Sequence, residues 1–343
     1  MNDQEEIMHK KIPSIFILIL ISICAFISFS GVSCAKDEVN DTASEIPFDK
    51  ERAFSYLEYQ VNAGFRVPGT KTHVEIKDWI VQTLTDAKAS MIMTQPFTHM
   101  DGKKEIQMHN IIGEFTAAKT VGNPKTIVFA AHWDSRPMSE KDIIAENRAE
   151  PLPGANDGAS GVAVLLEVAN QLNSMELPCN VRLLFFDGED YGDFLGGGSQ
   201  IFNNLDAGDV LLGAKFYAQN HGKKAPDFVV LIDLVGKEGL TIYREPHSEV
   251  RAKEVNDLVF GVAKELGFTN SLGDSKPRFV DEMSTNPTID DHIPLLKAGI
   301  PAVCLIDLDY AAWHTTNDTV DKCSPDSLEM VGKVLLGVVK NVN

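Results

Sequence analysis

The sequence predicts an α/β fold: a single domain with a mixed, mostly parallel central sheet flanked by helices on both faces. Short runs rich in β-branched and apolar residues recur along the chain, and helical patterns lie between them. The 343 residues are 44% hydrophobic and 23% charged, as in an ordinary globular protein. After the N-terminal leader described below, roughly 300 residues remain, which suits one large α/β domain.

Two helices are predicted at the start of this domain. Asp49 precedes residues 50–63, in which apolar side chains recur at helical spacing, and Gly64 follows as a stop signal. Residues 66–70 have the composition of a turn. Apolar residues then support a second helix: Val74, Trp79, Ile80 and Leu84.

Strand-like and helical segments alternate through the rest of the chain. The predicted strands are residues 107–115, 126–131, 181–186, 228–234 and 302–306. The predicted helices are residues 161–172, 248–266 and 326–339. Because ligands of such sheets bind beyond the carboxyl ends of the strands, we expect the functional residues there.

The N-terminus has the layout of a secretory signal. His9, Lys10 and Lys11 precede an apolar run over residues 15–29, which is short for a membrane span. Cys34 resembles a bacterial lipoprotein acceptor, and the acidic residues after it resemble the export tag of Bacteroidetes lipoproteins.

We therefore expect a lipoprotein-type signal peptide over residues 1–33, a polar tether over 34–47 and the catalytic domain over 48–343. The protein would then be exported, as a periplasmic or outer-membrane lipoprotein of a bacterial cell envelope. The alternative is an uncleaved signal anchor in which Cys34 has no role.

Charge and cysteine content narrow the possible partners. A formal net charge of -18 and a pI near 4.9 argue against nucleic acid, whose phosphates require clustered Lys and Arg. Membrane contact is expected only through the possible lipid anchor.

The cysteines of the folded part do not have the spacing of a thiolate metal site; they are Cys179, Cys304 and Cys323. Cys304 is expected to be a small buried hydrophobe. The sequence does not decide whether two of the three form a disulfide.

Acidic residues and histidines follow the ends of several predicted strands. They are His132 and Asp134, Asp157 in a glycine-rich loop, Glu189 and Asp190, Asp233, and His314. Histidine nitrogen and carboxylate oxygen are ligands that Zn²⁺ prefers, and a catalytic zinc uses three of them while leaving one position for water or substrate. The pattern predicts a zinc site at this edge of the sheet.

These motifs resemble the M28 family of zinc aminopeptidases and, within it, the glutaminyl cyclases. Five segments in the same order carry the resemblance: residues 131–137, 154–161, 185–190, 290–294 and 313–315. The resemblance implies a zinc aminopeptidase-like fold. It also implies an acyltransferase that closes the N-terminal glutamine of peptides or proteins into pyroglutamate and releases ammonia.

The resemblance also implies the site residues and their roles. Asp157, Asp190 and His314 would bind one zinc ion, at a centre where most cyclases carry Glu in place of Asp190. Glu189 would be the general acid/base. Asp233 and Asp290 would form a carboxylate pair near the transferred proton, and Trp313 would line the substrate pocket. His132 and Asp134 would support the ligands.

Two other functions compete with the cyclase. In a two-zinc aminopeptidase, His132 and Asp233 would complete a second metal site and a bound hydroxide would attack the peptide bond. A non-catalytic binding module on the same scaffold is the third possibility. Residues 290–294 and Trp313 favour the cyclase over the peptidase, and the complete set of ligands and base argues against the binding module.

Several residues also have a structural interpretation. Asp157 could be a helix N-cap, and Glu189 and Asp190 could form a solvated acidic loop. His292 is expected to start a helix and to bond to backbone. Residues 196–198, a glycine triplet, are expected to form a flexible rim, and the remaining histidines to serve surface or packing roles, namely His73, His99, His109, His221 and His247.

Overall fold

The computed structural model describes residues 46–118, 123–192, 209–222, 225–269 and 276–342. Residues Asn40–Asn343 form one compact unit. The leader, nearly all of the tether and the glycine triplet at residues 196–198 lie outside the described residues, so the expectations for them stay predictions. Within the described ranges, no helix combines the length and the apolar character that crossing a membrane requires.

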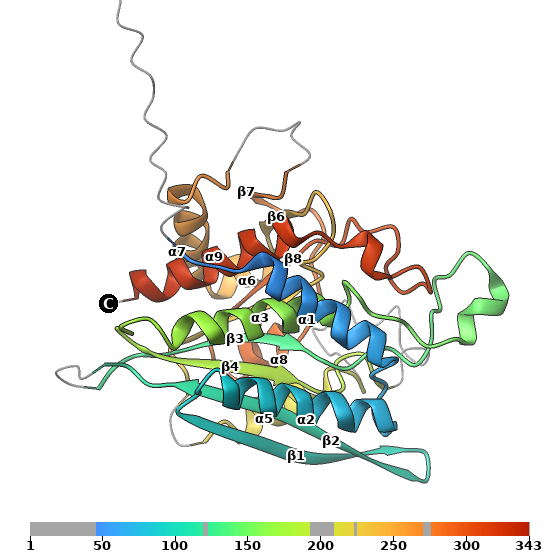
Figure 1. Ribbon diagram of the computed structural model, residues 1–343. Helices are drawn as coiled ribbons and strands as arrows, with labels where there is room; N and C mark the ends of the chain where they lie inside the picture. Colours follow the sequence, from blue (N-terminus) through green and yellow to red (C-terminus); the bar gives the residue numbers. More distant parts are fainter. Residues whose placement is uncertain (1–45, 119–122, 193–208, 223–224, 270–275, 343) are drawn as a thin grey trace, which may run out of the picture. The chain divides into compact units, whose positions relative to one another are not determined.

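A six-stranded mixed sheet forms the centre of this unit, in the order β1-β2-β4-β3-β5-β8 (Figure 1). β3 pairs in parallel with β4 and β5, and β5 with β8, whereas β2 pairs antiparallel with β1 and β4. The strands are β1 Met91–Asp101, β2 Lys104–Phe115, β3 Thr126–His132, β4 Asn180–Phe186, β5 Phe228–Asp233 and β8 Ala302–Ile306. The predicted α/β class with a mostly parallel sheet is confirmed.

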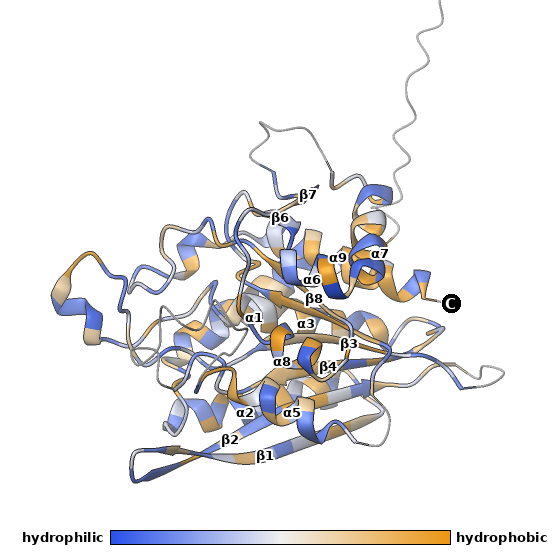
Figure 2. Ribbon diagram, turned by 180° about the vertical axis from the view of Figure 1, so that it is seen from behind, coloured by the Kyte–Doolittle hydropathy of each residue, from blue (hydrophilic) through white to orange (hydrophobic). Residues whose placement is uncertain are grey.

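Helices cover both faces of the sheet because alternate residues of its inner strands are apolar. Ile127 and Phe129 of β3 pack into a large core with α1, α2, α3 and α9. Val128 and Ala130, which point the other way, pack into a smaller core with α5 and α8. The inner strands consequently show as mostly hydrophobic, whereas β1 and β2 carry hydrophilic positions (Figure 2).

The helices begin and end close to the predicted positions where the apolar periodicity is strong. Among the described residues they are α1 Lys50–Ala63, α2 Lys71–Asp86, α3 Ala159–Leu172, α5 Leu212–Asn220, α6 Pro246–Arg251, α7 Lys253–Glu265, α8 His292–Lys297 and α9 Pro325–Asn341. Asp49 caps α1 as expected, because its side chain accepts a hydrogen bond from the Arg52 amide.

The prediction of one helix over residues 248–266 was wrong. The chain leaves helical geometry at Ala252, where φ is −140° and ψ is 37°, and this break separates α6 from α7. The break allows the two helices to contact different neighbours. The Ser248 hydroxyl of α6 accepts a hydrogen bond of 3.1 Å from the Cys304 amide of β8, while α7 packs against α9.

Several elements were not predicted from the sequence. Strand β1 is an edge strand with exposed residues on both faces, so it lacks the apolar run of the inner strands. The short helix α5 and a separate two-stranded parallel sheet, formed by β6 Thr241–Arg244 and β7 Arg278–Met283, were not predicted either. These short elements carry too few residues for a clear periodic signal.

Glu245 joins this smaller sheet to the segment that carries Asp290. Its side chain caps α6 by accepting hydrogen bonds from the amides of His247 and Ser248, and it accepts another from the Thr288 amide. It also bonds the ring of His292 at 3.1 Å. Burial acts to raise the pKa of this carboxyl, but the bond to His292 and the amide bonds outweigh burial and lower the pKa to about 2.

The depressed pKa of Glu245 predicts a pH-dependent contribution to stability. A carboxyl whose pKa is lower in the folded state stabilises the fold above its ordinary pKa of 4.5, and the contribution fades as the pH falls toward 2. We expect Glu245→Gln to lower the free energy of unfolding by about 2–3 kcal/mol at pH 7. In urea titrations the gap to the wild type should narrow as the pH is lowered from 5 toward 3; an equal gap at both ends would contradict this account.

Candidate metal centre and active site

The candidate site is a cavity of about 290 Å³ that the predicted ligand, acid/base and pocket residues line together. Those residues come from loops far apart in the sequence: Asp157, Glu189, Asp190, Asp233, Asp290, Trp313 and His314. Asp233 ends β5, and Glu189 and Asp190 follow the end of β4. The site therefore lies at the carboxyl ends of the parallel strands, where such sheets place their ligands.

Asp157, Asp190 and His314 converge in the manner of a metal centre. One ligand atom of each lies within 4.8 Å of the others, and all three side chains are buried. The His314 Nε2 atom lies 3.6 Å from the Asp157 Oδ2 atom and 3.9 Å from the Asp190 Oδ1 atom. The buried Oδ2 atoms of Asp157 and Asp190 accept no hydrogen bond from the described residues. Unpartnered carboxylate oxygens beside an imidazole nitrogen fit a divalent cation such as zinc.

Arg136 and Glu140, to which the sequence analysis assigned no role, hold two of these three side chains. An Arg136 Nη1 atom donates to Asp190 at 2.5 Å, and its Nε atom donates to Glu140 at 2.8 Å. The other Glu140 oxygen lies 2.6 Å from the His314 Nδ1 atom. This bond turns the His314 Nε2 atom toward Asp157 and Asp190, a common arrangement around metal-binding histidines.

The pKa of Glu140 agrees with its position between Arg136 and His314. Burial acts to raise it, but the hydrogen bond and charge of His314, together with Arg136, lower the pKa to about 2. Glu140 therefore stays ionised at neutral pH and accepts from both partners. In the sequence, the only indication of a role for Glu140 was that it lies close to the motif at residues 131–137.

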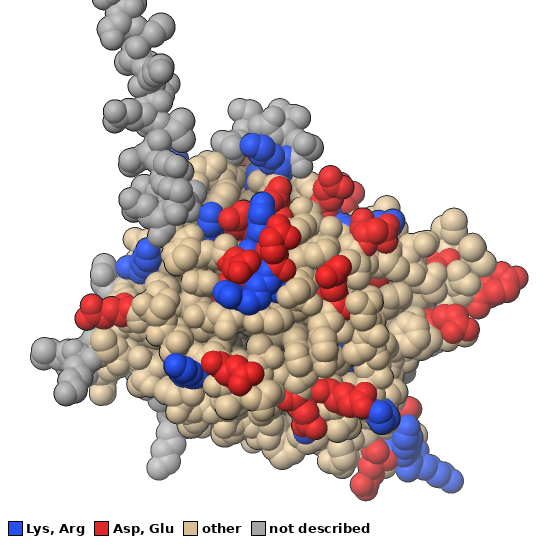
Figure 3. Space-filling model, in the orientation of Figure 1, with Lys and Arg blue, Asp and Glu red and all other residues tan. Residues whose placement is uncertain are grey.

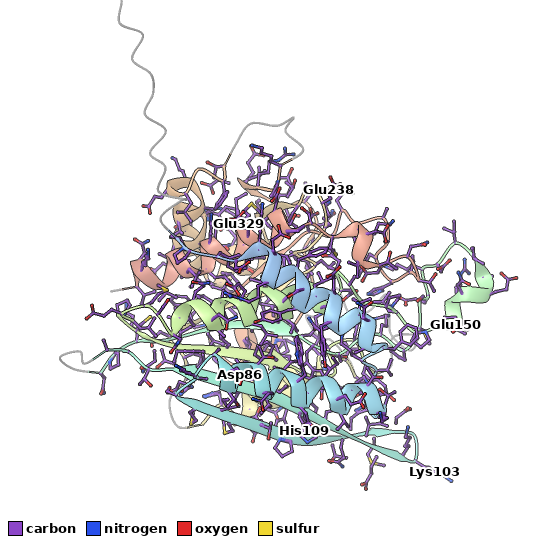
Figure 4. The ribbon with its side chains drawn as sticks, viewed as in Figure 1. Asp86, Lys103, His109, Glu150, Glu238 and Glu329 are labelled. Atoms are coloured by element: carbon purple, nitrogen blue, oxygen red, sulfur yellow. The ribbon has the colours of Figure 1, made fainter. Side chains whose placement is uncertain are left out.

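The loop that carries Glu140 also fixes the backbone of His314, which has a positive φ of 56°. Such a conformation is unusual for a non-glycine residue and needs support. The Lys141 amide donates to the His314 carbonyl at 3.1 Å, and the Asp142 carboxylate accepts from the Thr316 amide at 3.0 Å. This loop, which includes Glu150, projects from the sheet on the right of Figures 1 and 4.

Trp313 lies in the cavity wall. The Lys141 Nζ atom lies 2.9 Å from the centroid of its indole ring, so a cation covers one face of the ring. The ring also lies beside the His314 imidazole, at 4.4 Å between centroids. The packing of Trp313 is therefore tied to the residue expected to bind metal.

Asp157 is positioned by its loop and does not cap the following helix. The N-cap of α3 is Gly158, which has a φ of 87° and no side-chain cap bond. A Cβ atom on Gly158 would lie 2.8 Å from the Asp134 carbonyl, so only glycine fits. The Asp318 carboxylate holds the loop by accepting from the amides of Asn156 and Asp157 at 2.9 and 3.0 Å.

His132 and Asp134 lie beneath the cavity in contact with its residues. Asp134 accepts hydrogen bonds of 3.2 Å from the amides of Glu189 and Asp190, which fixes the backbone of both. The His132 Nε2 atom lies 3.2 Å from carboxylate oxygens of Asp157 and Asp233. His132, Asp157 and Asp233 also form a second group that could hold a metal ion.

Three further carboxylates give the cavity its acid/base capacity. Burial and the charge of Asp190 raise the pKa of Glu189 well above its usual range, with His132 opposing them. Burial, with a contribution from Asp290, raises the pKa of Asp233 to about 7 although His132 lowers it. Asp233 is thus poised to exchange protons near neutral pH, and a bound divalent cation would lower the pKa values of both Glu189 and Asp233.

Asp290 interacts with Cys304, and all three described cysteines are free thiols. Cys304 is buried in β8 as predicted, but its thiol also donates to Asp290 at 3.2 Å. Cys179 and Cys323 complete the set, so the structure contains no disulfide among these three residues.

His292 differs in part from expectation, whereas His73 has a packing role of the kind expected. His292 starts α8 as predicted, but its ring bonds the Glu245 carboxylate rather than backbone. His73 is buried, stacks on Trp133 at 4.2 Å between ring centroids, and lies 2.8 Å from Asp187. Asp187 precedes Glu189 by two residues, so this buried contact supports the start of the acidic loop. In the sequence, the only indication of a role for Asp187 was its place in the acidic run after the strand, where it was assigned no role.

The fold and this constellation of residues define the class of protein. Residues 110–339 match peptidase family M28, and the chain belongs to that family.

Among solved structures, a glutaminyl cyclase of Bacteroides thetaiotaomicron is 31% identical, with a TM-score of 0.76, over 87% of this chain and 100% of that chain. A Zn-dependent exopeptidase of Parabacteroides distasonis is 29% identical, with a TM-score of 0.76, over 86% of this chain and 99% of that chain. The glutaminyl-peptide cyclotransferase of Drosophila melanogaster is 26% identical over 287 residues, 78% of this chain and 75% of that protein. The chain is thus similar to cyclases and to peptidases.

The contact between Glu140 and His314 predicts a loss of metal affinity when it is removed. Glu140→Gln keeps the shape of the side chain but replaces the charged acceptor of the His314 ring, so zinc affinity should fall by about 10- to 100-fold. Competition with a zinc-binding dye measures the change. Glu146→Gln, in the exposed part of the same loop, is the matched control and should bind as the wild type does. Equal affinities for both variants would show that Glu140 does not position the ligand.

Proposed function

We propose that this protein is a glutaminyl-peptide cyclotransferase with one zinc ion, acting on peptides or proteins that begin with glutamine. The observation that carries the proposal is the cavity itself. It combines the Asp157–Asp190–His314 group with three carboxylates outside that group and with an aromatic wall at Trp313. The cyclases among its relatives support this function.

Different residues of the cavity would bind the metal and transfer the proton. Asp157, Asp190 and His314 would hold a zinc ion, which acts as a Lewis acid on the γ-carbonyl group of the N-terminal glutamine. Glu189 accepts a proton from the α-amine as the amine nitrogen bonds to the γ-carbonyl carbon. Glu189 then donates that proton to the amide nitrogen, which leaves as ammonia when its bond to carbon breaks. Overall, one C–N bond forms and one breaks.

Asp233 and Asp290 provide the negative environment for the amine. Asp233 is fixed by a bond of 2.7 Å from the Leu234 amide, and Asp290 by bonds from the Asp291 amide and the Cys304 thiol. These contacts leave both side chains in the wall of the cavity. The neutral α-amine of the substrate would donate hydrogen bonds to such carboxylates, which is why we assign this part of the cavity to the amino terminus.

A two-metal aminopeptidase is the second candidate, and one observation favours it. His132, Asp157 and Asp233 form a further buried group of possible ligands, so the cavity could hold two ions that share Asp157. The exopeptidase among the similar structures has the same overall fold. In the cyclase, by contrast, His132 would bind no metal and would only contact the carboxylates of Asp157 and Asp233.

One experiment separates these functions. The purified protein is incubated with two peptides that differ only in an N-terminal glutamine or leucine, and ammonia and free amino acids are followed while bound zinc is counted by elemental analysis. Ammonia from the first peptide, no leucine from the second and one zinc per chain would support the cyclase. Free leucine and two zinc ions per chain would establish the peptidase, and inactivity on both peptides would exclude both enzymes.

The role given to Glu189 predicts a variant that binds metal without turnover. Glu189→Gln removes the proton acceptor but leaves Asp157, Asp190 and His314 in place. We expect kcat to fall by about 10²- to 10⁴-fold, while the zinc content stays that of the wild type. Steady-state kinetics and elemental analysis measure the two quantities. A near-normal kcat would remove Glu189 from the mechanism, and loss of zinc would make it a ligand.

A further inference from the structure

A second cavity of about 330 Å³ adjoins the catalytic one. Thr288, Ile306 and Leu308 line both cavities, so the two are separated only by shared side chains. The rest of its wall comes from the ends of β6 and β7 and from the loop that follows β8. This volume has no role in the reaction described above, which takes place entirely in the first cavity.

The second cavity has an acidic lining. Its described wall contains four carboxylates and no Lys or Arg, the four being Glu245, Glu282, Asp307 and Asp309. Two of them are already engaged: Glu245 caps α6, and Asp307 forms an ion pair of 2.8 Å with Lys237. Glu282 and Asp309 are exposed and form no ion pair with any described residue. The cavity therefore offers two carboxylates to a ligand from solution.

The other side chains of this cavity suit a long cationic group. Tyr243 offers an aromatic ring, which attracts cations over its face. Met283, whose side chain is 59% exposed, offers an apolar surface for the methylene stem of Lys or Arg. The combination is selective: a short acidic side chain would meet like charge, and an apolar one would leave the carboxylates unused.

The chemistry of the first cavity places the substrate chain beside the second. The α-amine and the continuing peptide chain leave from the same carbon atom of the N-terminal residue. With the amine at Glu189, Asp233 and Asp290, the chain must leave the cavity near those residues. Thr288 lies two residues from Asp290, and it belongs to the boundary between the cavities. The residue after the N-terminal glutamine is therefore the one that reaches the second cavity.

We propose that the second cavity is a substrate subsite that binds the side chain following the N-terminal glutamine and selects Lys or Arg. The proposal rests on the proposed cyclase function and adds a substrate class to it. Selection comes from Glu282 and Asp309, with Tyr243 and Met283 contacting the stem. The molecule has an excess of acidic groups, and on the face drawn in Figure 3 they are interspersed with Lys and Arg.

The test compares peptides that differ only in charge at the second position. Gln-Arg-Ala amide is compared with Gln-citrulline-Ala amide, in which a neutral group of nearly the same shape replaces the guanidinium. From two exposed ion pairs we expect kcat/KM to be about 5- to 10-fold higher for the arginine peptide at low salt. The ratio should decline as salt screens the charges.

The double variant Glu282→Gln, Asp309→Asn should bring this ratio close to one. Glu58→Gln, Asp86→Asn is the matched control, because it removes two carboxylates from α1 and α2, which do not line the cavity; Asp86 is labelled in Figure 4. The control variant should keep the wild-type ratio. All residues changed are exposed, so thermal melting curves should remain those of a folded protein.

The outcomes separate the two proposals. If neither peptide releases ammonia, the cyclase function itself is wrong. If both are converted with equal kcat/KM, or if the preference survives in the Glu282/Asp309 variant, the cyclase stands and the subsite is wrong. A preference lost equally in the control variant would assign the effect to net charge and would also overturn the subsite.

Discussion

The crowding of buried and half-buried carboxylates at one edge of the sheet is the constraint on which the rest of the structure depends. Asp157, Glu189, Asp190, Asp233 and Asp290 share one cavity, although like charges in a medium of low polarity repel strongly. The protein opposes this repulsion with Arg136 against Asp190 and with His132 between Asp157 and Asp233. The oxygens left without partners are those that a divalent cation would neutralise.

The scaffold holds these charges by backbone contacts that leave the carboxylates little freedom to move apart. Asp134 accepts from the amides of Glu189 and Asp190, and Asp318 accepts from the amides of the Asp157 loop. The positive φ of His314 is supported in the same way by the loop that carries Glu140. A preorganised site of this kind needs little rearrangement when a cation or a substrate amine arrives. In the proposed function, the same supports would serve both metal binding and proton transfer.

The two cavities would have different roles in the proposed function, the first in the reaction and the second in binding the substrate chain. The first contains the reacting groups and could host cyclase or peptidase chemistry, since both sets of possible ligands include Asp157. The second contains no residue to which the proposed reaction assigns a role, and it shares Thr288 and Leu308 with the first. Changes in Glu282 or Asp309 could alter which peptides are chosen while leaving the chemistry intact.

The fold was predictable where burial is strong and less so at its periphery. Inner strands such as β3 and β5 are buried along their whole length, which produces continuous apolar runs in the sequence. Strand β1 is exposed on an edge, and the break at Ala252 depends on what α6 and α7 each pack against. Neither leaves a periodic pattern, because their conformation is decided by neighbours distant in the chain.

The sequence by itself determined the α/β class, the edge of the sheet at which the candidate site lies and the residue types found there, because these follow from local periodicity and from residues next to strand ends. Only the tertiary structure decided that Glu140 meets His314, that Cys304 bonds Asp290 and that His73 bonds Asp187. Each of these contacts joins residues from different elements. Their distance depends on how the sheet, loops and helices pack together, which no short stretch of sequence encodes.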